Sequence, residues 1–234
     1  MTLGFSVSAA ALVPTISTLA LLEFDGAENA SLRSMLSRES SDTLRGRKIA
    51  VLVADGVEEI EVSFPLHVLR ALGAGVELIA PREGPTLAKL GLSSPPQRNS
   101  HILTVRFMEN SGWLRFDRTI EDAKAADYDA VYVPGGAWSP DTLRINLHTL
   151  EFLRTAQAAG KLIASICHGP QVLINAGILK SKRATGYWAI HADLSNAGVQ
   201  VQDVPVVVDG NLITSRYPLD LPEFIDAIEK HLRR

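Results

Sequence analysis

The amino-acid sequence predicts an α/β fold in which helices cover both faces of a mostly parallel sheet. Residues 48–54, 129–136 and 161–166 contain continuous apolar runs, which are typical of strands buried on both faces. Segments with the apolar spacing of helices alternate with these runs. The chain has 234 residues, of which 46% are hydrophobic and 21% are charged, so it is long enough for one sizeable core.

The first of these runs opens a βαβ unit. The strand at residues 48–54 is followed by a turn at Asp55 and Gly56, and residues 76–80 form the next strand. Pro65 lies within the helix expected between them and predicts a kink or a broken first turn. The apolar stripe of that helix consists of Phe64, Val68, Leu69 and Leu72.

Residues 81–120 interrupt the α/β alternation, and we interpret them as a β-hairpin insertion. Residues 102–107 and 113–120 alternate between apolar and polar side chains, as strands do. The sequence "ENSG" at residues 109–112 is expected to form the turn between them.

The α/β alternation returns after the insertion. We expect a helix at residues 142–160, a short helix at 169–179 and a terminal helix at 221–232. Residues 205–215 predict a hairpin with Asp209 and Gly210 at its turn. His148 and His191 are expected on helices, at the surface.

We interpret residues 1–46 as an N-terminal extension and linker, and residues 47–234 as one domain. Residues 37–47 are polar and turn-rich, as linkers are. Residues 1–22 carry no charge, but Pro14 and several Ser and Thr interrupt their apolar run, so no stable membrane span is expected. No basic residue precedes that run, which favours a helical appendage or an over-extended start above a signal peptide or anchor.

Charge and cysteine content exclude several classes of protein. The 23 basic and 26 acidic side chains give a net charge of −3, which leaves no broad basic surface for nucleic acid. The chain has one cysteine, Cys167, which excludes an internal disulfide and a cysteine-cluster metal site. A lone cysteine fits a reducing compartment, so we expect a cytoplasmic protein without metal or organic cofactor.

Three segments at the carboxyl ends of predicted strands carry the candidate chemistry. They are "DGVEEIE" at residues 55–61, "PGGAWSPD" at 134–141 and "CHGP" at 167–170. Ligands of open α/β sheets bind outside the carboxyl ends of the strands. The predicted fold therefore has the means to bring these distant segments together.

Cys167 is the candidate nucleophile and His168 its candidate base. Cys167 lies where a strand turns into a helix, and the helix N-terminus is expected to lower the pKa of the thiol. A thiolate is the form that attacks a carbonyl carbon. The alternatives are a buried structural cysteine and a structural or solvated histidine, and this stretch alone leaves both open.

Four further residues have two interpretations each. Gly135 and Gly136 either expose backbone N–H groups to a developing oxyanion or form an ordinary turn. In one interpretation the Glu61 carboxylate interacts favourably with the helix dipole. In the other it is buried and protonated on the sheet side of the helix and hydrogen-bonds the thiolate. Asp141 either caps a helix or orients a histidine.

Four stretches of this sequence together resemble the ThiJ/PfpI family, within the glutamine amidotransferase-like superfamily. They are "VADGVEEIEVSFPLHVLRALG", "VYVPGG", "SICHGPQVLINAGILK" and "VVVDGNLITSRYPLDLPEFIDAI". The similarity spans residues 47–234 and is most specific around Cys167. It implies a flavodoxin-like sandwich, a homodimer or larger homo-oligomer, and a cysteine on a strained nucleophile elbow.

The resemblance also implies roles for the candidate residues. Cys167 and His168 match the nucleophile and base of the intracellular protease branch, and Glu61 matches the carboxyl that contacts the thiol. Gly136 and the backbone of His168 match the oxyanion donors. Asp141 stands where that branch uses a glutamate from a neighbouring subunit, and its shorter side chain and longer loop leave its role open. Tyr187 also resembles the protease branch, because relatives nearer the parkinsonism-associated member carry histidine there.

The function expected from these residues is that of a cysteine-dependent hydrolase. Its substrates would be peptides or small carbonyl compounds such as glyoxal and methylglyoxal adducts, and each reaction begins with attack on an electrophilic carbon. The alternative is a non-enzymatic redox-sensing stress protein or chaperone that uses an oxidisable Cys167.

Overall fold

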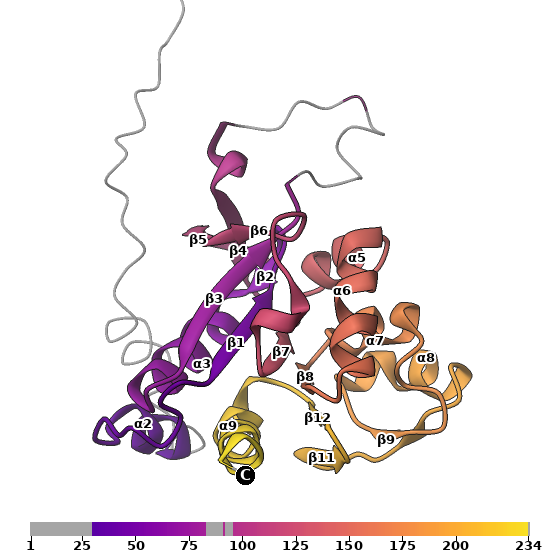
Figure 1. The fold of residues 1–234 in the computed structure, drawn as a ribbon. Coiled ribbons are helices and arrows are strands. Elements are labelled where there is room, and N and C mark those ends of the chain that lie inside the picture. Colours follow the sequence, from indigo (N-terminus) through magenta and orange to yellow (C-terminus); the bar gives the residue numbers. More distant parts are fainter. Residues whose placement is uncertain (1–29, 83–90, 92–95, 234) are drawn as a thin grey trace, which may run out of the picture.

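The structure is a computed structural model that describes residues 30–82, 91 and 96–233. Its central sheet has seven strands in the order β11-β12-β8-β7-β1-β3-β6. All neighbouring strands are parallel except β11 and β12, so the predicted mostly parallel α/β fold is confirmed (Figure 1). The strands are β1 (Lys48–Leu52), β3 (Gly75–Ala80), β6 (Arg118–Thr119), β7 (Ala130–Val133), β8 (Leu162–Ile166), β11 (Val206–Asp209) and β12 (Leu212–Ser215).

Helices cover the two faces of this sheet (Figure 1). One hydrophobic cluster joins the sheet to α2 (Ala30–Leu36), α3 (Glu59–Ala71) and α9 (Leu221–Leu232). The other joins it to α5 (Trp138–Leu143), α6 (Leu147–Ala158), α7 (Pro170–Ala176) and α8 (His191–Asn196). Short 3-10 turns span Pro96–Asn99, Ala125–Asp127, Trp188–Ile190 and Pro218–Asp220.

Of the kink or broken first turn predicted at Pro65, the broken turn is wrong, because helix α3 continues through Pro65. Proline has no N–H group, which leaves the carbonyl of Glu61, four residues earlier, without its helical donor. The hydroxyl of Tyr132 donates to that carbonyl at 2.6 Å, and Tyr132 is fully buried. A hydrogen bond from strand β7 therefore compensates for Pro65 and ties Glu61 to the sheet.

The predicted hairpin is present as β4 (His101–Arg106) and β5 (Glu109–Arg115), which pair antiparallel. It also pairs with β2 (Val57–Glu58) to make a separate three-stranded sheet. Residues 116–120 leave the hairpin and contribute β6 to the edge of the central sheet, whereas the sequence predicted them as part of the second hairpin strand.

The turn of this hairpin lies at Phe107 and Met108, so the turn predicted at residues 109–112 is wrong. Phe107 adopts a positive φ of 56°, and its N–H donates to the Glu58 carboxylate at 2.9 Å. The pairing shifts at Ser111, between Asn110 and Gly112, which is a β-bulge. Polar and glycine residues mark bulges as well as turns, and here the bulge accounts for them.

Two other boundaries differ from the sequence prediction. The helix predicted at 142–160 is divided into α5 and α6, because the side chain of Asn146 caps a new helix by accepting the N–H of Thr149 at 2.9 Å. The turn between β11 and β12 lies at Gly210 and Asn211, one residue later than predicted. Helix α8 contains His191, which was expected on a helix whose bounds were not given, and the short pair β9 (Arg183–Ala184) and β10 (Gln200–Val201) was not predicted.

The described part of the N-terminal segment packs onto the fold. Leu32 and Met35 of α2, with Leu44, are buried in the same cluster as α3 and α9. The otherwise polar stretch at 37–47 thus contains one fully buried side chain. The expectations for residues 1–22 lie outside the described residues. Within the described ranges, no helix combines the length and apolarity that crossing a membrane requires.

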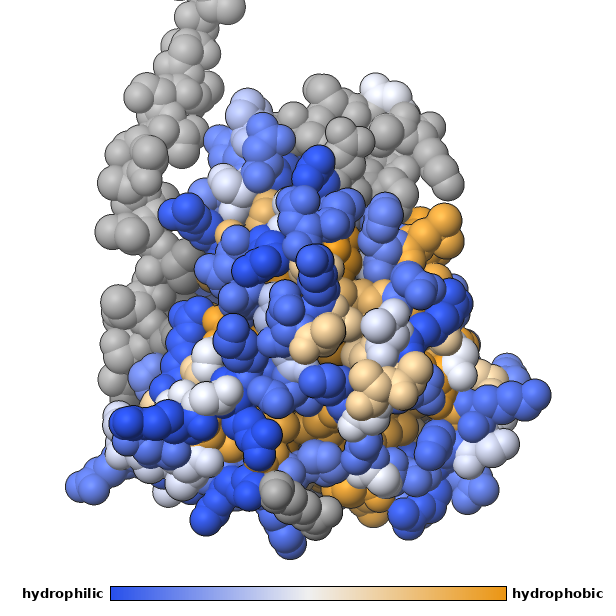
Figure 2. All heavy atoms as spheres, viewed as in Figure 1, coloured by the Kyte–Doolittle hydropathy of each residue, from blue (hydrophilic) through white to orange (hydrophobic). Residues whose placement is uncertain are grey.

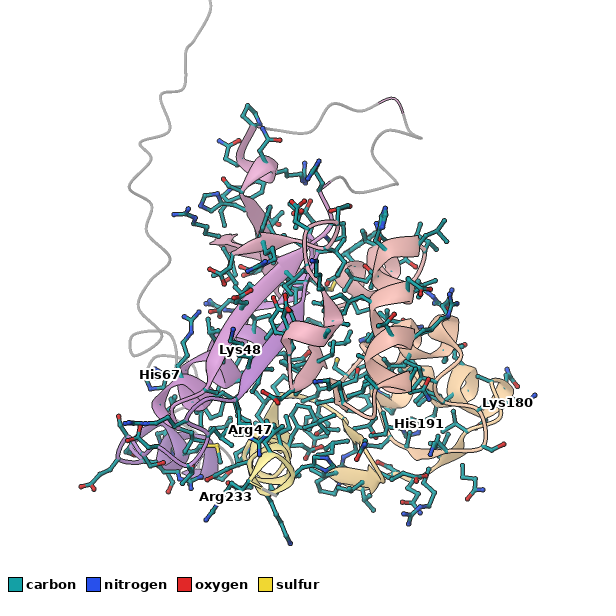
Figure 3. The ribbon with its side chains drawn as sticks, in the orientation of Figure 1. Arg47, Lys48, His67, Lys180, His191 and Arg233 are labelled. Carbon is teal, nitrogen blue, oxygen red and sulfur yellow. The ribbon has the colours of Figure 1, made fainter. Side chains whose placement is uncertain are left out.

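The two histidines predicted on helices have different environments. His148 is exposed on α6. His191, labelled on α8 in Figure 3, is half-buried and its Nε2 lies 3.0 Å from the carbonyl oxygen of Gly186. His191 therefore anchors a loop, which corrects its interpretation as a surface residue. Hydrophilic residues cover most of the molecular face that Figure 2 shows.

Candidate active site

Cys167 occupies a strained position directly after β8. Its φ of 59° is unusual for a residue with a side chain. Two backbone hydrogen bonds hold it there: its N–H donates to Ser215 at 3.2 Å, and its carbonyl accepts the N–H of Tyr187 at 2.8 Å. Strand β12 and the segment before α8 thus fix the conformation that aims the thiol away from the strand.

The Cys167 thiol contacts His168. The distance between Sγ and Nδ1 is 3.3 Å, within the range of a sulfur hydrogen bond. The two neighbouring side chains therefore meet, which their sequence adjacency alone did not establish. Cys167 is 7% exposed and His168 is half-buried, so solvent reaches both side chains only in part.

Glu61 reaches the thiol from α3. Its Oε2 accepts the N–H of Gly135 at 2.7 Å, and the carboxyl lies near enough to Cys167 for the two groups to shift each other's pKa. Complete burial, reinforced by the charge of Glu58, raises the pKa of Glu61 to about 8. The carboxyl is therefore protonated at neutral pH, as expected from its predicted position on the sheet side of the helix.

The thiol itself is harder to ionise than the sequence predicted. Burial raises the pKa of Cys167 well above its usual value, and the nearby Glu61 raises it further. Hydrogen bonds from the backbone N–H groups of Gly136 and His168 act in the opposite direction but are smaller effects. The expected lowering of the thiol pKa by the start of α7 is therefore wrong, because desolvation outweighs it.

His168 is suited to accept the thiol proton. Burial lowers its pKa below the usual value, and the charge of Asp193 on α8 partly opposes this. The imidazole is therefore neutral at pH 7. Asp193 also accepts a hydrogen bond from Gln171 at 3.1 Å. Sequence reasoning missed Asp193, because expecting a helix at His191 does not show that the helix packs beside His168.

The two glycines after β7 have separate roles. The N–H of Gly135 is occupied by Glu61, so Gly135 is not available as an oxyanion donor, which corrects that expectation. The N–H of Gly136 faces the sulfur. Gly136 has a φ of 76°, and a Cβ there would lie 2.3 Å from the carbonyl oxygen of Gly56. Only glycine fits this approach between strand ends.

Asp141 does not join the site within one chain. It is exposed in the first turn of α5, and no hydrogen bond or ion pair links it to His168 in the described residues. Whether Asp141 orients His168 of a second subunit, as the family resemblance suggests for this position, stays open. In the described part of the chain, no three His, Cys, Asp or Glu side chains converge in a way that would hold a metal ion.

Fold and site together define an α/β protein centred on one cysteine at the carboxyl edge of a parallel sheet. The DJ-1/PfpI family model matches residues 47–231, and the chain belongs to this family. The resemblance and the flavodoxin-like sandwich that it implied are therefore confirmed.

Three similar proteins illustrate this relationship. "Deglycase PfpI" of Pyrococcus furiosus is 34% identical over 186 residues, covering 80% of this chain and 99% of that protein. "Protein/nucleic acid deglycase 2" of Escherichia coli is 35% identical over 179 residues, covering 76% and 93%. The crystal structure of DJ-1beta from Drosophila melanogaster matches with a TM-score of 0.68 at 28% identity, covering 80% and 90%.

Replacing Glu61 with Gln is expected to stabilise the protein increasingly as pH rises. The folded pKa of about 8 exceeds the ordinary value of 4.5, so the folded state holds one more proton than the unfolded state between these values. Wild-type protein therefore loses free energy of unfolding as pH rises from 4.5 through 8, by up to about 5 kcal/mol. Gln does not titrate and avoids this loss.

Urea unfolding of both proteins at pH 5, 7 and 9 measures this effect. Glu223→Gln on the exposed side of α9 is the matched control, with a constant difference from wild type expected. A Glu61→Gln difference that is equally constant would show that the carboxyl is ionised in the folded protein.

Proposed function

We propose that this protein is a cysteine-dependent deglycase that releases amines or thiols from methylglyoxal-type adducts. The observation that carries the proposal is the contact between Cys167 and His168 at 3.3 Å, beside a buried carboxyl. The enzyme names of the Pyrococcus furiosus and Escherichia coli relatives support it.

The raised pKa of the thiol favours attack with simultaneous proton transfer. Sγ of Cys167 bonds to the carbon that carries the amine or thiol, and the thiol proton moves to Nδ1 of His168. The bond from that carbon to the amine breaks, and His168 returns the proton to the leaving nitrogen. The released group is then a free amine, and the adduct stays on the cysteine as a hemithioacetal.

The bound adduct then returns the free thiol. A proton moves from the carbon that carries the sulfur to the neighbouring ketone carbon. This isomerisation converts the hemithioacetal into a lactoyl thioester without any external oxidant. Water hydrolyses that thioester to lactate. The backbone N–H groups of Gly136 and His168, which interact with the sulfur, are the candidates to stabilise the oxyanion that forms when water adds to the thioester.

Protonated Glu61 has a supporting role in this proposal. As a neutral acid it places no negative charge beside the developing sulfur anion. Its Oε2 atom accepts a hydrogen bond from the N–H of Gly135, which keeps the carboxyl in place. The sensor alternative uses the same thiol. The raised pKa of Cys167 opposes oxidation by peroxide as well as attack on carbon, because both require loss of the thiol proton.

A substrate panel tests the proposal. Wild-type protein is incubated with methylglyoxal adducts of N-acetyllysine and N-acetylcysteine, with free methylglyoxal and with fluorogenic peptides. We expect release of the modified amine or thiol together with lactate, both measured by mass spectrometry. Peptide cleavage without adduct turnover would assign the protein to peptidases instead, and no turnover of any substrate would contradict the proposal.

A further inference from the structure

A chain of contacting aromatic rings leads from the candidate base to the exposed Trp188. The His168 ring stacks on Tyr187 with centroids 4.8 Å apart, and the Tyr187 ring lies 4.1 Å from Trp188. Tyr217 meets Trp188 edge-on at 5.7 Å. Because His168 contacts Sγ of Cys167, this chain of rings begins at the reacting sulfur.

The backbone holds these rings in place relative to the nucleophile. The N–H of Tyr187 donates to the carbonyl of Cys167 at 2.8 Å. Trp188 begins a 3-10 turn that ends at Ile190, which is 2% exposed, and the N–H of Ile190 donates to Tyr187 at 2.9 Å. The segment is thus anchored on both sides of Trp188.

Trp188 is nevertheless largely exposed. Its exposed fraction is 58%, although two aromatic side chains contact it. An exposed indole that packs against Tyr187, whose ring contacts the candidate base, offers ring surface for stacking. We propose that Trp188, with Tyr187 beneath it, forms a subsite for a neutral aromatic or large apolar group attached next to the reacting carbon.

The electrostatics of the stack favour a neutral group over an anion. The cation at its far end is Arg216, whose guanidinium lies 5.1 Å from the centroid of the Tyr217 ring. Arg216 is already engaged, by Asp220 at 2.8 Å and by Asp203 at 3.0 Å. Among the described residues in contact with these rings, Arg216 is thus a paired cation, and the rings offer apolar surface. The inference deepens the proposed function and rests on the reactivity of Cys167.

Alkylation of Cys167 tests the subsite without requiring turnover. Sγ displaces iodide from iodoacetamide or from N-benzyl-2-iodoacetamide, forming a carbon–sulfur bond as the thiol proton is lost. Cys167 is the one cysteine of the chain, so intact mass reports its labelling directly. The rate constant for the benzyl reagent is divided by that for iodoacetamide. This ratio is then divided by the same ratio measured with free N-acetylcysteine, which corrects for the different intrinsic reactivity of the two reagents.

The expected corrected ratio for wild type favours the benzyl reagent by about two- to tenfold, the range for one aromatic stacking contact. Trp188→Ala should lower the ratio to about one, and Trp188→Phe should retain most of it. Phe107→Ala is the matched control, because Phe107 is a 78% exposed aromatic on the hairpin turn, and it should leave the ratio unchanged.

Three results would overturn the subsite. They are a wild-type ratio of one, a raised ratio that Trp188→Ala leaves unchanged, and a change of sedimentation coefficient in Trp188→Ala, which would assign Trp188 to an interface between copies. A Trp188-dependent ratio in a protein that turns over no substrate would instead contradict only the proposed function. A thiol that neither reagent labels would contradict both.

Discussion

Replacement of Cys167 by Ser is expected to lower adduct turnover at least about a thousandfold, as loss of a catalytic nucleophile does. Serine preserves the size of the side chain and the positive φ of 59°, so the fold should remain intact. Its hydroxyl is a far weaker acid and nucleophile than a thiol, and His168 is aligned on sulfur at 3.3 Å. The measurement is kcat/KM for the most active substrate of the panel.

The control for this substitution is the free energy of unfolding. An unchanged midpoint in urea, together with the loss of turnover, shows that the chemistry and not the fold is affected. Turnover within tenfold of wild type would remove Cys167 from the mechanism.

Replacement of Gly135 by Ala is the second large effect. An added Cβ would lie 2.6 Å from Cβ of Cys167 and 2.7 Å from Oε2 of Glu61, and these are distances that carbon atoms do not tolerate. One of the two side chains must shift. We expect a loss of stability of about 1–3 kcal/mol from overpacking. We also expect a loss of activity of about a hundredfold or more, because small displacements of reacting groups have such effects.

Gly75→Ala is the matched control for Gly135→Ala. Gly75 begins β3, and a Cβ there would approach no atom closer than 3.7 Å. Its activity and unfolding midpoint should remain near those of wild type. Equal effects of the two substitutions would indicate that Gly135 has no special place beside the thiol.

Much of the fold could be predicted because buried strands and helical stripes leave strong periodic signals. The terminal helix lies at Leu221–Leu232, as the periodicity of its apolar residues predicted. Weaker signals were misread where one local hydrogen bond decides the structure. Asn146 divides a continuous helical pattern by capping a new helix, and Ser111 sits in a bulge that resembles a turn in sequence.

In the candidate site, too, some features could be predicted from the sequence and others could not. Strand-end position identified Cys167, and its side of α3 identified Glu61, because parallel strands bring their carboxyl ends together. The direction of the thiol pKa was missed, since it depends on how completely the sulfur is buried. Asp193 was missed because the sequence does not show that the helix at His191 lies near His168. The oligomeric state, the role of Asp141 and the cellular location stay predictions.

The most direct test of the account is to isolate the covalent intermediate. Wild-type protein is mixed with a 13C-labelled methylglyoxal adduct in a single turnover, quenched in acid and digested for mass spectrometry. We expect a labelled three-carbon group on the peptide that contains Cys167, absent in Cys167→Ala and formed more slowly in His168→Gln. Turnover by wild type with no label on Cys167, and equal turnover by Cys167→Ala, would contradict it.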